Sequence, residues 1–261
     1  MFSMATFLFD EIIFGPVSSR RLGASLGINL LPNDRKVCTF NCIYCECGWT
    51  EKDVRKMTFH PRKEVRYRLE SRLDKMKKNK EPLDTITFAG NGEPTMHPQF
   101  DLIIQDTIGI RNRMFPGAKI AVLSNASLLY KPKIFNALKQ VDQSILKLDS
   151  VFEETVELIN QPYEGFDLKR TIEYLIRFNQ RSIIQTMFVK GTYKGKTFDN
   201  TTEEELVPLL ETIKKINPMQ VMIYTIARDT PAEGVEKIPY EVLKQIGKRV
   251  EDLGISVQIS D

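Results

Sequence analysis

From about residue 80 onward, the chain alternates short apolar runs rich in β-branched residues with longer segments of helical period. The apolar runs occupy 84–90, 118–125, 144–149, 182–190 and 220–227, and a sixth, ASLGINLL, precedes them at 24–31. Between the runs, apolar residues recur at helical spacing, as at Phe100, Ile103, Ile104 and Ile108. Strands and helices that alternate in this way predict right-handed βαβ units and a mainly parallel sheet.

Six such units indicate an α/β fold, either an open doubly wound sheet or an incomplete barrel, and periodicity leaves both open. Both architectures place the active site at the C-terminal ends of the strands. No low-complexity tract, repeat or linker divides the chain, which predicts a single domain over 1–261. Within it we expect an N-terminal extension at 1–23 (a small hairpin or irregular segment), the sheet and its helices at 24–228, and a C-terminal helix and strand at 229–261.

Charge is nearly balanced, with 37 Lys and Arg against 34 Asp and Glu, so the whole molecule lacks the strong field that attracts nucleic acid or anionic membranes. The first residues make a poor signal peptide, and no apolar run reaches the roughly 20 residues of a spanning helix. These features predict a cytoplasmic protein with no membrane partner. Cytosolic thiols stay reduced, so clustered cysteines there indicate metal ligands or catalytic groups.

All four cysteines lie within ten positions, in the segment KVCTFNCIYCECGWT. The spacing Cys38-x3-Cys42-x2-Cys45 is too dense for the usual structural zinc site, in which two cysteine pairs stand a dozen or more residues apart. Three thiolates this close together can each hold one iron of a 4Fe-4S cubane and leave the fourth iron without a protein ligand. An open metal position is where chemistry takes place, by the logic that separates catalytic from structural zinc.

A second motif, FAGNGEPTMHP, follows the strand expected at 84–90. Gly90 and Gly92 allow the backbone to approach a ligand without interference from a Cβ atom, and Glu93 adds a carboxylate suited to an ammonium group. The alternative is an ordinary turn before a helix whose first turn contains Pro98.

The three-cysteine spacing, with Tyr44 directly before Cys45, resembles the signature of the radical S-adenosylmethionine (SAM) superfamily. The resemblance implies a partial (β/α)6 barrel in which this loop follows the first strand. It implies two cofactors: a 4Fe-4S cluster held by Cys38, Cys42 and Cys45, and SAM, whose amino and carboxylate groups chelate the open iron. Reductive cleavage of SAM then yields a 5′-deoxyadenosyl radical that abstracts hydrogen from a substrate.

The segment Gly92-Glu93-Pro94 is similar to the Gly-Gly-Glu-Pro motif of the superfamily, with Asn91 intervening. The similarity implies that Glu93 and the nearby backbone hold the amino group of SAM.

Further candidates for SAM binding are residues at or near the ends of the later predicted strands. They are Ser124, Asn125, Lys147, Asp149, Gln185 and Ile226. Two charges on one face of an apolar strand are costly unless they are paired or bound to something. Lys147 and Asp149 therefore form either an internal salt bridge or contacts with the carboxylate and ribose of SAM. The resemblance implies that Ile226 lies beside the adenine.

Cys47 and Arg228 are the candidates for contact with the substrate. Cys47 falls outside the three-cysteine pattern, and three roles are open to it: a small residue without a special role, a thiol that returns a hydrogen atom, or a fourth ligand that would close the open iron. Arg228 follows the sixth strand, where it either grips an acidic substrate or is a solvated strand end.

Residues 14–100 resemble the branch that includes the wyosine-type tRNA-modifying Fe-S oxidoreductases. The likeness rests on FGPVSSRRLGASLGINLLP, the cysteine loop and GNGEPTMHP. The wyosine enzymes carry further cysteines for a second cluster, whereas this chain has none after Cys47. A single-cluster enzyme is therefore expected.

The segment 51–80 is strongly basic, with twelve Lys and Arg against five acids, a net charge of +7. It is a solvated helix, a surface for RNA phosphates, or a dock for an acidic electron donor such as flavodoxin or ferredoxin. The leading hypothesis is thus a radical SAM enzyme, oxidoreductase-like, with an unidentified substrate. One alternative is an RNA-modifying enzyme that uses this segment, and another is a non-catalytic iron-sulfur or zinc-binding protein.

Overall fold

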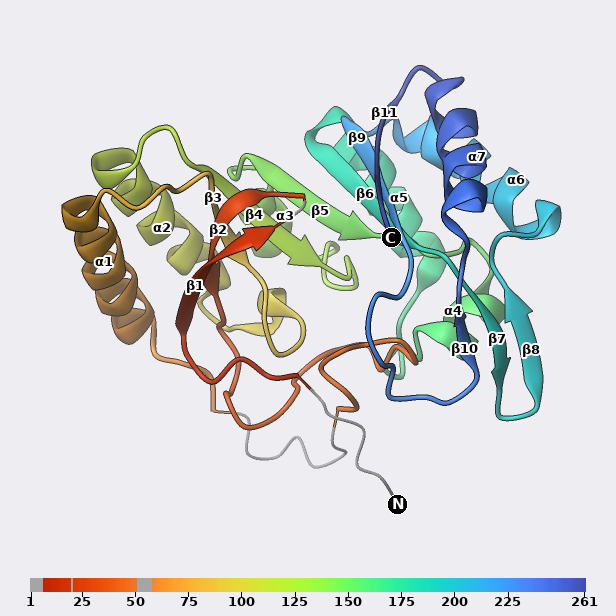
Figure 1. Cartoon of the computed structure of the whole chain (residues 1–261), viewed down its shortest axis with the longest axis horizontal. Helices are drawn as coiled ribbons and strands as arrows, with labels where there is room; N and C mark the ends of the chain where they lie inside the picture. Colours follow the sequence, from red (N-terminus) through yellow and green to blue (C-terminus); the bar gives the residue numbers. More distant parts are fainter. Residues whose placement is uncertain (1–6, 20, 51–57) are drawn as a thin grey trace.

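An eight-stranded sheet, curled into a half-barrel, dominates the computed structural model (Figure 1), which describes residues 7–19, 21–50 and 58–261. The strands follow the order β1-β2-β3-β4-β5-β6-β9-β11. All neighbouring pairs are parallel except β1 and β2, which are antiparallel. The α/β half-barrel implied by the family resemblance is confirmed.

The strands are β1 (Ile13–Ser19), β2 (Gly23–Ile28), β3 (Thr85–Phe88), β4 (Lys119–Ser124), β5 (Gln143–Lys147), β6 (Ser182–Met187), β7 (Val189–Tyr193), β8 (Lys196–Asp199), β9 (Gln220–Tyr224), β10 (Val235–Lys237) and β11 (Ser256–Ser260). The helices are α1 (Arg62–Asn79), α2 (Phe100–Met114), α3 (Pro132–Leu138), α4 (Glu153–Ile159), α5 (Leu168–Phe178), α6 (Glu203–Ile216) and α7 (Tyr240–Glu251), with short 3-10 turns η2 (Pro94–Met96) and η3 (Asn179–Arg181).

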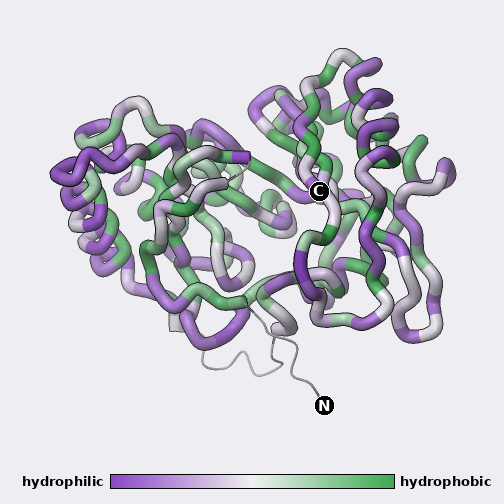
Figure 2. Tube along the Cα trace, in the orientation of Figure 1, coloured by the Kyte–Doolittle hydropathy of each residue, from purple (hydrophilic) through white to green (hydrophobic). Residues whose placement is uncertain are grey.

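The six predicted strands are β2 to β6 and β9, and they are buried on both faces. On β4, for example, Ile120 and Val122 join the large core beneath the helices, whereas Ala121 belongs to a small cluster on the concave face. Burial on both sides explains why these strands read as continuous apolar runs instead of alternating ones. Figure 2 shows the same distribution as hydrophobic colour along the strands.

Both ends of the described chain extend this sheet. The expected N-terminal extension supplies β1, which forms a hairpin with the first strand of the half-barrel. The expected C-terminal helix and strand are α7 and β11, and β11 pairs in parallel with β9.

The run at 182–190, expected as one strand, is two strands in the structure. β6 ends at Met187, the amide of Phe188 donates to the carbonyl of Tyr224 (2.8 Å), and β7 continues into a separate antiparallel sheet with the order β10-β7-β8. Lys194 and Gly195 connect β7 to β8 with φ values of +50° and +76°, as a two-residue type I′ hairpin requires. Gly195 is the residue of this pair whose type favours such a turn, because glycine adopts a positive φ without strain.

The small sheet packs against the cysteine loop, here defined as residues 36–50. Val189 of β7 and Phe198 of β8 are buried in one cluster with Phe40, Ile43 and Tyr44 of the loop. The small sheet therefore forms one wall of the site described below.

The second half of the basic segment forms helix α1. Residues 51–57, with Lys52, Arg55 and Lys56, lie outside the described part of the chain. The buried face of α1, which includes Leu69, packs on the core, and its outer face is largely hydrophilic (Figure 2). Ion pairs within the helix, such as Arg68 with Glu64 (3.1 Å), neutralise part of its charge. In the described ranges, no helix is both long and apolar enough to cross a membrane.

Replacing Phe198 by alanine should remove the contact between the small sheet and the cysteine loop. We expect the free energy of unfolding to fall by about 3–5 kcal/mol, because a buried aromatic ring is lost and a cavity remains. Tyr67→Ala on α1 is the matched control, since this ring is 70% exposed and its loss should change stability by about 0.5 kcal/mol or less. Equal effects of the two substitutions in denaturant titrations would contradict the packing described here.

Candidate active site

The cysteine loop is held by backbone hydrogen bonds to the segment that follows β3. The amide of Val37 donates to the carbonyl of Asn91 (2.7 Å), and the amide of Glu93 donates to the carbonyl of Val37 (3.0 Å). Gly92 lies between them with φ +136°, and a Cβ atom here would stand 1.8 Å from the Val37 oxygen. Only glycine allows this approach, so the motif after β3 fixes the start of the loop that contains the cysteines.

Asn91, the residue that interrupts the glycine motif, has a structural role. Its buried side chain accepts from the amide of Phe9 (2.8 Å) and donates to the carbonyls of Phe9 (2.9 Å) and Pro32 (2.8 Å). This departure from the family motif therefore anchors the N-terminal segment beside the site.

N–H groups surround the cysteine sulfurs, and all four cysteines are free of disulfides. The amide of Phe40 and the side chain of Asn125 donate to Cys38 Sγ (3.4 and 3.6 Å). The side chain of Asn160 donates to Cys42 Sγ (3.5 Å). Hydrogen bonds to sulfur are among the interactions by which proteins tune iron-sulfur clusters.

A buried lysine lies among the three cysteines of the motif. The ammonium of Lys36 donates to the carbonyl of Gly48 (2.9 Å), and the side chain is only 4% exposed. Burial opposes its charge, but the nearby thiols of Cys45, Cys38 and Cys42 outweigh burial and raise the pKa of Lys36. One ammonium thus interacts electrostatically with all three predicted iron ligands.

The thiols differ in their affinity for a proton. Burial raises the pKa of Cys38 to about 12 and also raises the pKa of Cys42. A hydrogen bond between the Cys45 and Cys47 side chains, followed by the charge of Lys36, lowers the pKa of Cys45 despite burial. The Cys47 sulfur also lies 3.4 Å from the carbonyl oxygen of Gly90. The role of Cys47 stays a prediction.

Glu93 is almost completely buried and accepts four hydrogen bonds. One carboxylate oxygen accepts from the amide and hydroxyl of Thr95 (3.1 and 2.6 Å) and from the hydroxyl of Ser124 (2.9 Å). Among the described residues, the other oxygen accepts one hydrogen bond, from the amide of Asn125 (2.6 Å). Burial raises the pKa of Glu93, and these donors oppose that rise. The structure thus brings together the predicted residues Gly92, Glu93, Ser124 and Asn125.

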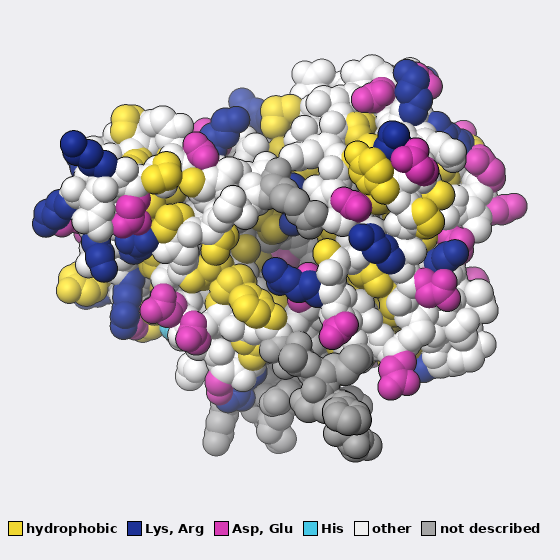
Figure 3. All heavy atoms as spheres, in the orientation of Figure 1, with side chains coloured by type: hydrophobic (Ala, Val, Ile, Leu, Met, Phe, Trp, Pro, Cys, Tyr) yellow, Lys and Arg dark blue, Asp and Glu magenta, His cyan; other side chains and the backbone are white. Residues whose placement is uncertain are grey.

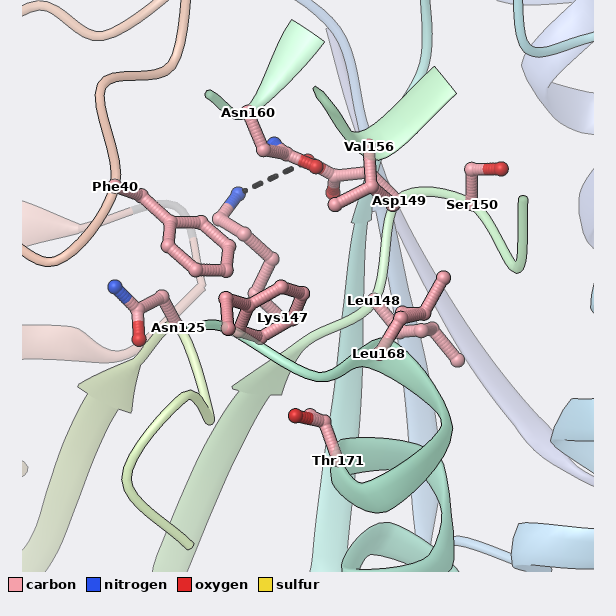
Figure 4. Close-up of a pocket in the computed structure, with 11 residues that line it drawn as sticks. Phe40, Asn125, Lys147, Leu148, Asp149, Ser150, Val156, Asn160, Leu168 and Thr171 are labelled. Atoms are coloured by element: carbon pink, nitrogen blue, oxygen red, sulfur yellow. Dashed lines mark hydrogen bonds and ion pairs between the residues drawn. The ribbon is translucent and has the colours of Figure 1, made fainter. Parts of the chain in front are cut away.

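Lys147 and Asp149 form an ion pair (3.3 Å) at the end of β5 (Figure 4), as the salt-bridge interpretation expected. Tyr44 donates its hydroxyl to Asp149, and Lys147 donates to the Tyr44 hydroxyl (2.8 Å). Asn160 donates to Asp149 (2.7 Å), and the amide of Met187 donates to the other oxygen of the carboxylate (2.9 Å). Burial opposes the charge of Lys147, yet Asp149 raises the pKa of Lys147. This network joins the cysteine loop to β5, α4 and β6.

A small cavity of about 10 Å³, the room of roughly one water molecule, adjoins this network. Phe40 and Asn125 line it opposite Lys147 and Asp149 (Figure 4). The cavity therefore lies between the two groups of predicted SAM-binding residues.

The remaining predicted residues lie further from these contacts. Gln185 is buried on β6 in register with Lys147, and Ile226 packs against the cluster that contains the cysteine loop. Arg228 forms an exposed ion pair with Glu46 of the cysteine loop (2.7 Å) and lines a surface depression with Asp229. The roles predicted for these residues stay predictions.

Three residues that sequence reasoning missed take part in the site: Lys36, Asn160 and Tyr224. Lys36 lies two positions before Cys38, and Tyr224 lies two positions before Ile226, so both had a positional signal. Asn160 ends α4, which no pattern predicted, and only the tertiary structure brings it to Cys42 and Tyr44.

The residues present fit an iron-sulfur cluster better than a single metal ion. In the part of the chain that is described, no three His, Cys, Asp or Glu side chains are arranged for one ion. A cubane places each thiolate on a different iron and so spaces its ligands more widely than one ion does. Three thiols around one ammonium, with N–H donors to two of the sulfurs, provide a suitable donor set.

Comparison with known proteins agrees with this fold and this loop. Residues 35–203 match the family model described as the radical SAM superfamily. The chain belongs to the radical SAM superfamily and is an enzyme of this group. Membership implies SAM and a 4Fe-4S cluster as cofactors, and it argues against the non-catalytic alternative.

Among related sequences, a UPF0026 protein from Helicobacter pylori is 33% identical over 238 residues, which cover 89% of this chain and 72% of that protein. Among solved structures, Streptococcus suis SuiB bound to SAM superimposes with a TM-score of 0.62 at 15% identity over 87% of this chain. The chain spans only about half of SuiB (49%). TYW1 with a lysine-pyruvate adduct gives a TM-score of 0.59 at 14% identity, over 87% of this chain and 73% of that one. At these identities the two structures show a shared fold.

Gly92→Ala should displace the start of the cysteine loop. Its methyl group would collide with the Val37 carbonyl, and its φ disfavours any side chain. We expect a loss of about 1–3 kcal/mol of stability and a lower iron content after anaerobic reconstitution. Gly117→Ala is the matched control, because a Cβ there meets nothing within 4 Å. Full iron content in the Gly92 variant would contradict this account.

Acid should destabilise the protein through His97. Its Nδ1 accepts from the amide of Gln99 (3.1 Å) and its Nε2 faces the carbonyl of His60 (2.9 Å), so the ring is neutral. Burial lowers the pKa of His97 below 6.5, its value in an unfolded chain. The stability that the neutral ring contributes is therefore complete above pH 6.5 and is lost as the pH falls through the lowered pKa. Denaturant titrations between about pH 5 and pH 7 should show a steeper loss for the wild type than for His97→Gln.

Proposed function

We propose that this protein binds one 4Fe-4S cluster through Cys38, Cys42 and Cys45 and cleaves SAM reductively. The observation that carries the proposal is that Asn125 joins the cysteine loop to Glu93: its side chain donates to Cys38 Sγ (3.6 Å) and its backbone amide donates to the Glu93 carboxylate (2.6 Å). When bound, the reduced cluster and SAM supply a 5′-deoxyadenosyl radical that abstracts a hydrogen atom from the substrate.

Glu93 is the residue that we assign to the amino group of SAM. One of its carboxylate oxygens accepts a single hydrogen bond, from Asn125, and has a lone pair left for an ammonium. Because a buried carboxylate without a countercharge is costly, a bound ammonium would offset its desolvation. Ser124 and the backbone of Asn125 orient Glu93, and Gly92 allows the loop to lie close to it.

Lys147, Asp149 and Tyr44 hold the far side of the cofactor site. The Lys147 side chain is 15% exposed and Asp149 is fully buried, so we assign Lys147 to the SAM carboxylate and Asp149 to positioning Lys147 and Tyr44. Gln185, in register with Lys147, is assigned to the ribose, and Ile226 to the adenine.

The enzyme needs an external one-electron donor, and flavodoxin or ferredoxin fits this requirement. The exposed cations of α1 support either a solvated helix or a dock for such a donor. The RNA-modifying alternative rests on the same basic segment, and its substrate stays a prediction.

The direct test is to reconstitute the cluster anaerobically, reduce it with dithionite and measure 5′-deoxyadenosine released from SAM. We expect product from the wild type and none above background from Cys42→Ala, which loses an iron ligand and with it the cluster. An intact cluster that gives no product would overturn the proposal.

Cys47→Ala is the matched cysteine variant. We expect it to retain both the cluster and SAM cleavage, because three ligands suffice. Loss of the cluster in this variant would identify Cys47 as a fourth ligand and would contradict the open iron.

A further inference from the structure

Leu22, directly before β2, lies on the concave face of the half-barrel. It packs against a buried cluster with one residue from each of four neighbouring strands: Ala121 of β4, Ile145 of β5, Ile183 of β6 and Met222 of β9. Its carbonyl accepts from the hydroxyl of Thr85, the first residue of β3 (2.9 Å), so Leu22 lies at the N-terminal end of the half-barrel.

Arg21, the neighbour of Leu22, extends along this concave side. Its guanidinium carbon lies 5.3 Å from the ring centroid of Tyr224, the last residue of β9. The Tyr224 hydroxyl in turn accepts from the ammonium of Lys147 (3.5 Å). Arg21 thus reaches from the closed end of the half-barrel toward the edge where the candidate active site lies. Figure 3 shows this face hollowed at its centre, with Lys or Arg side chains inside and beside the hollow.

The guanidinium of Arg21 has no carboxylate partner within the described ranges. In these ranges the guanidinium contacts the Tyr224 ring, and the backbone amide of Arg21 donates to the hydroxyl of Ser19. Other partly buried arginines of this chain do pair with acids, as Arg62 does with Asp106 (2.6 Å) and Arg111 with Asp142 (2.8 Å). Arg21 is half-buried, and contact with an aromatic ring uses none of the five N–H donors of its guanidinium as hydrogen bonds to oxygen. These donors are therefore available to another acceptor.

The acids of the candidate active site do not supply this acceptor. Glu93 accepts four hydrogen bonds, and Asp149 accepts from Tyr44, Lys147, Asn160 and a backbone amide. Near Tyr224, Arg21 and Lys147 carry two positive charges and Asp149 carries one negative charge, so a net positive charge remains. A guanidinium matches carboxylate and phosphate oxygens with two parallel hydrogen bonds.

We propose that Arg21 binds an anionic group of the substrate, a carboxylate or a phosphate, inside the half-barrel. This inference rests on the proposed function, because it places the substrate beside the site assigned to SAM. Lys147, which we assign to the SAM carboxylate, reaches Tyr224 from β5, whereas Arg21 reaches the same ring from the turn before β2. The experiment below therefore saturates the SAM site before a second anion is measured.

The position of Arg21 in the chain agrees with a role in substrate choice. Arg21 and Tyr224 both lie outside residues 35–203, the part that matches the superfamily model. Elements that recognise the substrate are expected to differ between enzymes that share one cofactor chemistry. The β1–β2 hairpin is such an element, since it adds one cation to the concave face through a turn of its own.

The experiment uses two small anions as probes, inorganic phosphate and succinate, titrated by calorimetry. The protein carries its reconstituted cluster and excess SAM, so that the SAM carboxylate is not the anion measured. We expect one of the probes to bind the wild type, and Arg21→Gln to weaken that binding at least about tenfold, the effect of losing a charged hydrogen-bond donor. The probe that binds identifies the anion as a phosphate or a carboxylate.

Arg21→Lys keeps the positive charge but loses the two parallel N–H donors of the guanidinium. It should therefore weaken binding severalfold, which is less than the effect of Arg21→Gln. It also keeps the test valid if Arg21→Gln does not fold, which thermal melting will show. Arg68→Gln, on the exposed face of α1, is the control and should bind the probe as the wild type does. Binding of neither anion by the wild type, or equal affinities of the wild type and the Arg21 variants, would overturn the inference.

The outcome is separable from that of the proposed function. Arg21-dependent binding in a protein that releases no 5′-deoxyadenosine would overturn the proposed function and support the anion site. If the protein cleaves SAM but its affinity for the anion is unchanged in the Arg21 variants, the anion site alone would be overturned.

Discussion

The buried ion pair between Lys147 and Asp149 is the interaction on which the arrangement of the site depends. Neither charge is stable in the protein interior unless it is paired and hydrogen-bonded, and breaking a buried pair leaves an uncompensated charge that costs about 3–5 kcal/mol. The groups that satisfy this pair come from separate elements: Tyr44 from the cysteine loop, Asn160 from the end of α4 and the amide of Met187 from β6. Satisfying the pair therefore fixes the cysteine loop relative to the ends of β5, β6 and α4.

The opposite end of the cysteine loop depends on the backbone and not on charge. Val37 pairs with the segment around Gly92, where only glycine leaves room, and the same segment presents Glu93 to Ser124 and Asn125. The loop is thus held at the end of β3 by backbone hydrogen bonds and at the end of β5 by the ion-pair network. Cys38 and Cys42 lie between these two attachments, and Lys36 and Cys45 lie directly beside them, which gives a loop without disulfides a defined geometry.

Local patterns in the sequence predicted most of the fold and the part of the site that forms a motif. The six predicted strands are buried on both faces, so each leaves an apolar run. The four cysteines lie within ten positions of one another, and Gly92 and Glu93 are adjacent, so each motif is visible in the sequence. The small sheet was missed because the apolar run continues through Phe188, where the chain leaves the half-barrel. Asn160, Tyr224 and Arg21 were missed because the contacts that bring them to the site are with residues 77 or more positions away in the chain. For Lys147 and Asp149, alternation predicted the shared face, and only the tertiary structure supplied Tyr44 and Asn160 as partners.

The central claim is that three cysteines hold three irons and leave the fourth iron for SAM. Mössbauer spectroscopy of protein reconstituted with ⁵⁷Fe, recorded before and after SAM is added, tests it most directly, because the spectrum distinguishes irons by their ligands. The account predicts that one iron of the four changes its signal when SAM binds while the other three do not. Four irons with equivalent thiolate ligation and no response to SAM would contradict it.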